Sequence, residues 1–128
     1  MEHPEFAEDT SLLLEFIAES LEHLEGIDSD LLEYEKDPEN RERIDSIFRA
    51  IHSIKGASGF LELHGINMLA HRLETLLDQL RNGERSLDNE TLDLLLSGCD
   101  LVKSLIEEIN QRIDRQIEAR VAPNEERM

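Results

Sequence analysis

A histidine, a lysine and two glycines stand at helical spacing near the middle of the chain. His52, Lys55, Gly56 and Gly59 lie at offsets of zero, three, four and seven residues, so in an α-helix they share one face. A neutral imidazole nitrogen is a nucleophile, and a lysine ammonium offers a positive charge to a phosphoryl oxygen. The spacing therefore indicates a phosphoryl-accepting site centred on His52.

The two glycines are costly inside a helix. Each destabilises a helix interior by about 1 kcal/mol relative to alanine, whereas the intervening Ala57 and Ser58 are ordinary helical residues. Missing side chains beside a histidine let the active site of another protein approach the imidazole closely. We interpret Gly56 and Gly59 as an open docking face.

A phosphorylatable histidine needs a partner for its second ring nitrogen. A carboxylate that accepts a hydrogen bond from that nitrogen fixes the tautomer and makes the other nitrogen more nucleophilic. Farther along the chain, Glu74 stands beside Leu73 at the border of an apolar stripe, and His71 lies one turn earlier. An antiparallel neighbouring helix could present either Glu74 or His71 beside His52.

We expect helices to position these groups, because the composition of the chain favours helix formation. Aromatic residues make up only 4% of the chain, with three prolines and six glycines, which is typical of helices and not of sheets. Apolar residues recur at three- and four-residue steps in four segments: Asp9 to about Lys36, Pro38 to about Leu61, Ile66 to about Leu80, and Asp88 or Asn89 onward. The short connections predict an all-α, up-down-up-down antiparallel four-helix bundle.

Local signals predict where the first two helices begin. One residue among Asp9, Thr10 and Ser11 is expected to cap the first helix. Pro38 is expected in the first turn of the second helix, where its missing amide hydrogen is harmless.

Glycines and polar residues predict the remaining boundaries. Gly65 is expected to separate the second and third helices, and Asn82-Gly83 to end the third. Residues 109–122 form either a short extra C-terminal helix or the end of the fourth helix. The predicted domain spans residues 9–121, with an N-terminal tail at 1–8 and a tail or the start of a linker at 122–128.

Charge limits the classes of partner. The formal net charge of -17 repels nucleic acid and anionic membranes, so we expect neither as a partner. The sequence has no apolar run of about 20 residues and has an acidic N-terminus, from which we expect a cytoplasmic protein. Cys99 has no second cysteine to pair with and is expected to be a buried small residue.

Two linked motifs resemble those of a known family. The segment AIHSIKGASGFLEL, followed by AHRLETLLDQLRNGE, strongly resembles the histidine phosphotransfer (HPt) domains, above all the N-terminal one of the chemotaxis histidine kinase CheA. The family's H-x-[I/L]-K-G stands here as HSIKG at residues 52–56, and its H-x-x-E stands as HRLE at residues 71–74. The resemblance covers about residues 9–115 and is dense from Ile47 to Glu84.

This resemblance implies roles for individual residues. His52 would be phosphorylated and Glu74 would orient its imidazole, with Lys55 and His71 as neighbours of the phosphoryl group. The implied fold is a four-helix bundle, to which CheA members add a C-terminal helix.

The resemblance also implies partners for a chain that is not catalytic alone. Phosphate would come from the ATP-binding domain of a histidine kinase and pass to an aspartate of a response-regulator receiver domain, as in chemotaxis-type two-component signalling. The chain would bind no cofactor and no metal, because ATP and magnesium belong to the kinase domain or the receiver. A fragment of an ATP-dependent protein histidine kinase and a stand-alone HPt protein of a phosphorelay both remain open.

Two other classes of function are compatible with a helical bundle. A di-iron bundle needs Glu-x-x-His motifs, but the residues three positions before His23, His52, His64 and His71 are serine, arginine, leucine and methionine. A non-catalytic helical adaptor needs no active site, yet it leaves Gly56 and Gly59 unexplained.

Overall fold

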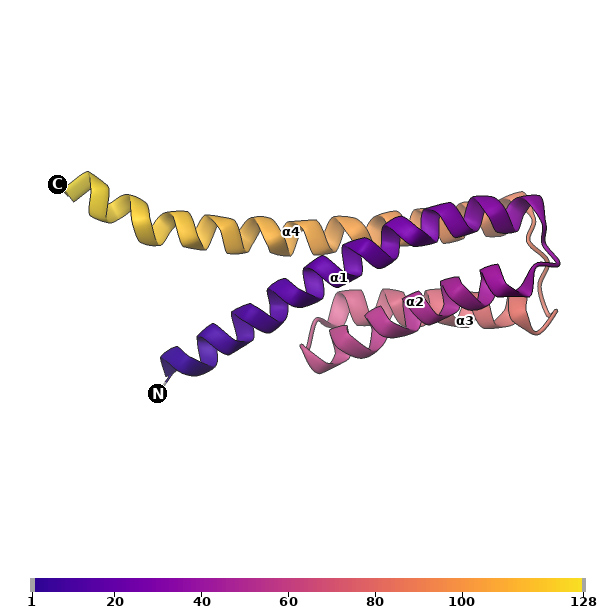
Figure 1. The fold of residues 1–128 in the computed structure, drawn as a ribbon, viewed down its shortest axis with the longest axis horizontal. Coiled ribbons are helices and arrows are strands. Elements are labelled where there is room, and N and C mark those ends of the chain that lie inside the picture. The colour runs from indigo at the N-terminus through magenta and orange to yellow at the C-terminus, as the bar shows by residue number, and fades with distance from the viewer. Residues whose placement is uncertain (1, 128) are drawn as a thin grey trace.

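Four helices make up nearly all of the chain that the structure describes. The computed structural model describes the backbone of residues 2–127 and the side chains of residues 10–118. The helices are α1 (Glu2–Lys36), α2 (Arg41–Phe60), α3 (His64–Arg81) and α4 (Asn89–Arg127), and residues 2–127 contain no strand. Successive helices run in opposite directions, and α1 and α4 extend beyond the shorter α2–α3 hairpin (Figure 1). The predicted all-α, up-down-up-down four-helix bundle is confirmed.

The apolar stripes of the helices meet in one core. The helix α1 packs against α2 and α4, and α3 packs against the same two helices. Each helix contributes at least one side chain with no exposed surface: Leu31, Ile51, Leu77 and Ile106. Burying a side chain of this size stabilises the fold by about 1.5–3 kcal/mol. Because Ile51 precedes His52, the core fixes the α2 backbone where the histidine projects from the bundle edge.

The first two helices begin at residues other than those predicted. The helix α1 already begins at Glu2, so Asp9, Thr10 and Ser11 lie inside it and the predicted cap is wrong. The helix α2 begins at Arg41, and the side chain of Asn40 accepts a hydrogen bond from the Glu42 amide at 3.1 Å. Pro38 lies in the preceding turn, so its predicted place in the helix is also wrong. An asparagine oxygen satisfies a free amide at a helix start, which proline cannot do.

The connection between α2 and α3 is tighter than predicted. The helix α2 ends at Phe60 and α3 begins at His64, so Gly65 lies in the first turn of α3 and does not separate the helices. The chain reverses through Glu62, whose φ of 60° is in the left-handed region. This conformation is uncommon for a residue with a Cβ atom. Because residue 62 is a glutamate and not a glycine, its type does not mark it as the turn.

The later boundaries match the sequence more closely. Asn82 is the C-cap of α3 and Gly83 has a φ of +75°, which confirms the predicted end. The carboxylate of Asp88 accepts a hydrogen bond from the Thr91 amide at 2.8 Å and so caps α4. The helix α4 is continuous to Arg127, so residues 109–122 are part of the fourth helix. Both segments predicted as tails are helical over residues 2–8 and 122–127.

Helix length alone does not make a membrane span. Within the described residues, no helix has a window apolar enough to cross a bilayer.

Candidate functional site

His52 and Glu74 meet between the two central helices. His52 projects from α2 and Glu74 from α3, and the antiparallel packing brings Nδ1 of the imidazole to 2.5 Å from Oε2 of the carboxylate. The contact joins residues 22 positions apart in the sequence. Apart from the family resemblance, the sequence left both Glu74 and His71 open as partners of His52. The structure places Glu74 beside His52.

Lys55 holds the other oxygen of the same carboxylate. Its Nζ donates to Oε1 of Glu74 at 2.6 Å. The side chain of Glu74 is 14% exposed and that of Lys55 is 24% exposed, so this ion pair is largely shielded from water. Glu74 therefore binds the imidazole with one oxygen and the ammonium with the other.

The electrostatics of Glu74 determine the tautomer of His52. Burial alone would raise the pKa of the Glu74 carboxyl, but hydrogen bonds from Lys55 and His52 and their positive charge outweigh burial and lower it. An ionised carboxylate can only accept hydrogen bonds, so Nδ1 of His52 must carry the hydrogen. In the neutral ring the lone pair is then on Nε2, and the His52 side chain is 62% exposed. The arrangement presents a nucleophilic nitrogen to solvent.

The two glycines have different surroundings. A Cβ atom added to Gly56 would meet nothing within 4 Å, so the backbone beside His52 is open. A Cβ atom on Gly59 would come within 3.1 Å of Nδ2 of Asn67. That amide donates to the Lys55 carbonyl at 2.8 Å, which ties the start of α3 to α2. Gly59 therefore has a packing role inside the chain, whereas Gly56 fits the predicted open face.

Ser58 is structural. It has no exposed surface, and its hydroxyl donates to the Lys55 carbonyl at 3.1 Å. Ser58 is thus the ordinary helical residue that was expected from the sequence.

His71 takes no part in the contacts that join His52, Lys55 and Glu74 in the described residues. It is exposed on α3, one turn before Glu74. Within the described residues, its side chain makes no hydrogen bond or ion pair with His52, Lys55 or Glu74.

Two residues that were not predicted as part of the site lie close to it. The ring of Phe48 stacks on the His52 imidazole, with 6.1 Å between centroids and 10° between planes. The guanidinium carbon of Arg81 lies 4.2 Å from the centroid of the Phe48 ring. Phe48 belongs to the periodic apolar residues of the second predicted helix, and its place four residues before His52 is a signal that the two rings could touch.

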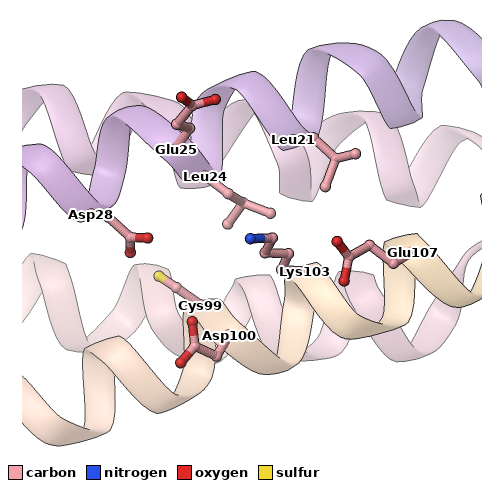
Figure 2. A pocket seen from close by; sticks show the side chains of 8 residues that line it. All are labelled: Leu21, Leu24, Glu25, Asp28, Cys99, Asp100, Lys103 and Glu107. Atoms are coloured by element: carbon pink, nitrogen blue, oxygen red, sulfur yellow. The ribbon is translucent and has the colours of Figure 1, made fainter.

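A separate pocket is built from α1 and α4 only. Its lining combines a thiol, two leucines and five charged side chains: Leu21, Leu24, Glu25, Asp28, Cys99, Asp100, Lys103 and Glu107 (Figure 2). Burial above all, and then the negative charges of Asp28 and Asp100, raise the pKa of the Cys99 thiol to about 12. The prediction that Cys99 is buried is confirmed. Within the described residues, no group of three or more histidine, cysteine or acidic side chains is placed to hold a metal ion.

Comparison with known families assigns the chain. The family model described as "Hpt domain" matches residues 11–119. The chain belongs to the Hpt domain family. The matched range includes His52, Lys55, Gly56, Gly59 and Glu74.

Similar proteins include a chemotaxis protein and a sensor histidine kinase. The Hpt domain is 37% identical over 101 residues to the chemotaxis protein CheA of Treponema pallidum, covering 79% of this chain and 12% of that protein. It is 37% identical over 95 residues to the sensor histidine kinase CheAY of Helicobacter pylori, covering 74% of this chain and 12% of that protein. The chain thus spans about an eighth of the length of these relatives.

A solved structure matches the fold. The CheA phosphotransferase domain from Thermotoga maritima superimposes with a TM-score of 0.73 at 36% sequence identity, covering 76% of this chain and 92% of that one. The bundle is therefore that of the CheA phosphotransferase domains.

Proposed function

We propose that this Hpt domain is a phosphoryl carrier in which Nε2 of His52 accepts a phosphoryl group from ATP held by a separate kinase domain and passes it to an aspartate of a response-regulator receiver. The observation that carries the proposal is the 2.5 Å contact between Nδ1 of His52 and the Glu74 carboxylate, on an imidazole that is 62% exposed. In the neutral ring, this contact puts the lone pair on the opposite nitrogen, Nε2, which belongs to an exposed side chain.

The first transfer needs no base from this chain. The Nε2 lone pair attacks the γ-phosphorus of ATP, a bond from nitrogen to phosphorus forms, and the bond from phosphorus to the bridging oxygen breaks with its electrons leaving on ADP. Because Nδ1 keeps its hydrogen, the phosphorylated ring is a cation. The Glu74 carboxylate, 2.5 Å away, stabilises that charge.

The second transfer reverses the bonding at nitrogen. An aspartate oxygen of the receiver attacks the phosphorus, and the electrons of the breaking bond return to Nε2 as a lone pair. His52 regains the neutral tautomer in which Nδ1 still donates to Glu74. The open backbone at Gly56, where a Cβ atom would meet nothing within 4 Å, gives the receiver room to approach.

The donor chemistry is supplied by another domain. The sequence contains no Gly-rich phosphate-binding motif, and the similar protein from Helicobacter pylori is named a sensor histidine kinase. ATP and magnesium would therefore be bound by the kinase domain, and a further magnesium by the receiver. A donor that uses ATP places the exchange in the cytoplasm, within chemotaxis-type two-component signalling.

Radiolabel transfer tests this function. The chain is incubated with a CheA-type kinase domain and ATP labelled at the γ-phosphate, and acid-labile, base-stable label is measured. We expect His52→Gln to abolish labelling and His64→Gln, an exposed histidine at the start of α3, to retain it. Labelling of His52→Gln at the wild-type level would contradict the assignment, and adding a receiver should drain label from the wild-type protein. A helical adaptor would acquire no label.

A further inference from the structure

His52 has a second contact, which involves the plane of its ring. The Phe48 ring lies one helical turn before it on α2, nearly parallel at 10° and with centroids 6.1 Å apart. This is an offset stack within the range of favourable aromatic pairs. The hydrogen bond to Glu74 acts at one ring atom, whereas the stack acts on a face of the imidazole.

Phe48 is itself held from the other side of the hairpin. The Arg81 guanidinium lies over the Phe48 ring at 4.2 Å from its centroid. Nε of Arg81 lies 3.0 Å from the Asp45 carboxylate, one turn before Phe48, and Nη1 lies 3.9 Å from Asp78. The Arg81 carbonyl also accepts a hydrogen bond from Arg41 at 3.0 Å. Arg81 is thus anchored at both its side chain and its backbone.

A hydrogen bond alone does not fix the direction of the attacking nitrogen. Rotation about χ2 of histidine meets only a broad, roughly two-fold barrier, so an imidazole that is 62% exposed can tilt while Nδ1 stays near its partner. Tilting moves the Nε2 lone pair away from the line of attack, and misalignment of reacting atoms slows transfer steeply. A flat ring stacked on one face restricts this tilt.

We infer that Phe48 is a positioning residue that sets the plane of the His52 imidazole, and that Arg81 holds Phe48 in place. The inference rests on the proposed phosphoryl transfer at His52 for its functional consequence, but not for the ring geometry. Glu74 sets which nitrogen attacks, and the row of Arg81, Phe48 and His52 sets where that nitrogen points.

The replacement Phe48→Leu removes the ring and keeps an apolar side chain of similar bulk. With a CheA-type kinase domain as donor, we expect kcat for phosphorylation to fall roughly fivefold with KM unchanged, the size of effect that loss of an aromatic pair produces. Phe48→Tyr keeps the ring and should therefore keep the wild-type rate. Phe16→Leu makes the same change in the core of α1, where Phe16 is 4% exposed, and should lower stability without lowering kcat.

A second pair of matched variants tests the contribution of Arg81. Arg81→Gln removes the cation over Phe48, and Arg112→Gln removes an arginine that pairs with Glu108 on α4 at 2.6 Å. We expect kcat to fall about twofold to threefold in the first variant, since an exposed cation–π contact is weak, and to stay unchanged in the second.

NMR of the unphosphorylated protein separates this inference from the proposed function. In Phe48→Leu the nitrogen shifts of His52 should still report hydrogen on Nδ1, while ¹³C relaxation of the imidazole should report greater ring mobility. Unchanged mobility together with an unchanged kcat in Phe48→Leu would overturn the positioning role. A wild-type chain that takes no label from the kinase would overturn phosphoryl transfer instead, and the ring mobility would still test the stack.

Discussion

Glu74 is the residue on which the chemistry of the site depends, because both of its oxygens are engaged. One oxygen fixes the tautomer of His52 and the other neutralises Lys55. A carboxylate is needed for both tasks, because an amide presents only one acceptor oxygen and no charge.

Replacement of this carboxylate should slow phosphorylation of His52. In Glu74→Gln the amide group can donate to Nδ1, which favours the tautomer with hydrogen on Nε2, and the phosphorylated ring loses its counter-charge. We expect the initial rate of labelling to fall about 10- to 100-fold. Glu107→Gln removes a carboxylate on α4 and serves as the control, with labelling as fast as in the wild type. Equal rates in the two variants would rule out the orienting role.

The same carboxylate gives stability a dependence on pH. The folded state lowers the pKa of Glu74, so its ionised form stabilises the fold. This contribution is complete above the unfolded-state pKa of about 4.3 and disappears as the pH falls through the lower folded-state value. In urea unfolding, the free energy of unfolding should therefore be lower for Glu74→Gln than for wild type at pH 7, and the difference should be smaller at pH 3. A gap that widens in acid would contradict the sign of the shift.

At the scale of elements, the α2–α3 hairpin contains every residue of the His52 site. The turn through Glu62 and the bond from Asn67 to the Lys55 carbonyl fix the alignment of the two helices. That alignment in turn brings Glu74 opposite His52.

The two glycines of α2 should respond differently to alanine. Gly56→Ala adds a methyl group in open space, so the better helix propensity should raise the free energy of unfolding by about 0.5–1 kcal/mol. Gly59→Ala presses on Asn67 at 3.1 Å, and we expect it to be less stable than Gly56→Ala. Denaturant midpoints compare the pair directly. Gly56→Ala should also raise KM for the kinase domain if the open backbone serves docking.

Apolar periodicity predicted the four helices and their order, because most of the stripe residues are buried in the core. It misplaced the start of α1, since the residues before Leu12 are mainly polar and carry no periodic signal. The helical spacing of His52 and the border position of Glu74 left both Glu74 and His71 open as partners of the imidazole, and only the family resemblance favoured Glu74. The ion pair between Lys55 and Glu74 was not predicted, because it depends on how α2 and α3 pack. The role of Arg81 could not be foreseen, because it depends on how α3 lies beside Phe48 across 33 residues of sequence.

At the scale of the whole molecule, charge is unevenly divided among the helices. The helix α1 has twelve acidic residues and one basic residue, whereas α2 has two acidic and four basic residues. The helix that carries His52 is thus positively charged in a protein with a net charge of -17. Two of the four basic side chains, Arg43 and Lys55, pair with Asp30 on α1 and Glu74 on α3, so neighbouring helices neutralise part of this excess.

Substitutions in α4 should change the stability of the bundle without changing phosphorylation of His52, because α4 contributes no residue to the site. Ile106 on α4 has no exposed surface, and Ile106→Ala should lower the free energy of unfolding by about 2–5 kcal/mol. Leu101→Ala changes a side chain that is 51% exposed on the same helix and should cost much less. Urea unfolding measures both variants, and labelling per folded molecule should be unchanged in each. Slower labelling per folded molecule in Ile106→Ala would show that α4 influences His52.

The buried thiol of α4 has a practical consequence for such measurements. Because the pKa of Cys99 is raised to about 12, almost none of it is thiolate at neutral pH, and maleimide reagents should leave it untouched in the folded protein. A reporter cysteine added on the surface, for example at Ser53 beside His52, can then carry a fluorophore without removal of the natural one. The native chain thus already suits single-site labelling, with which docking of a kinase or receiver domain can be followed in real time.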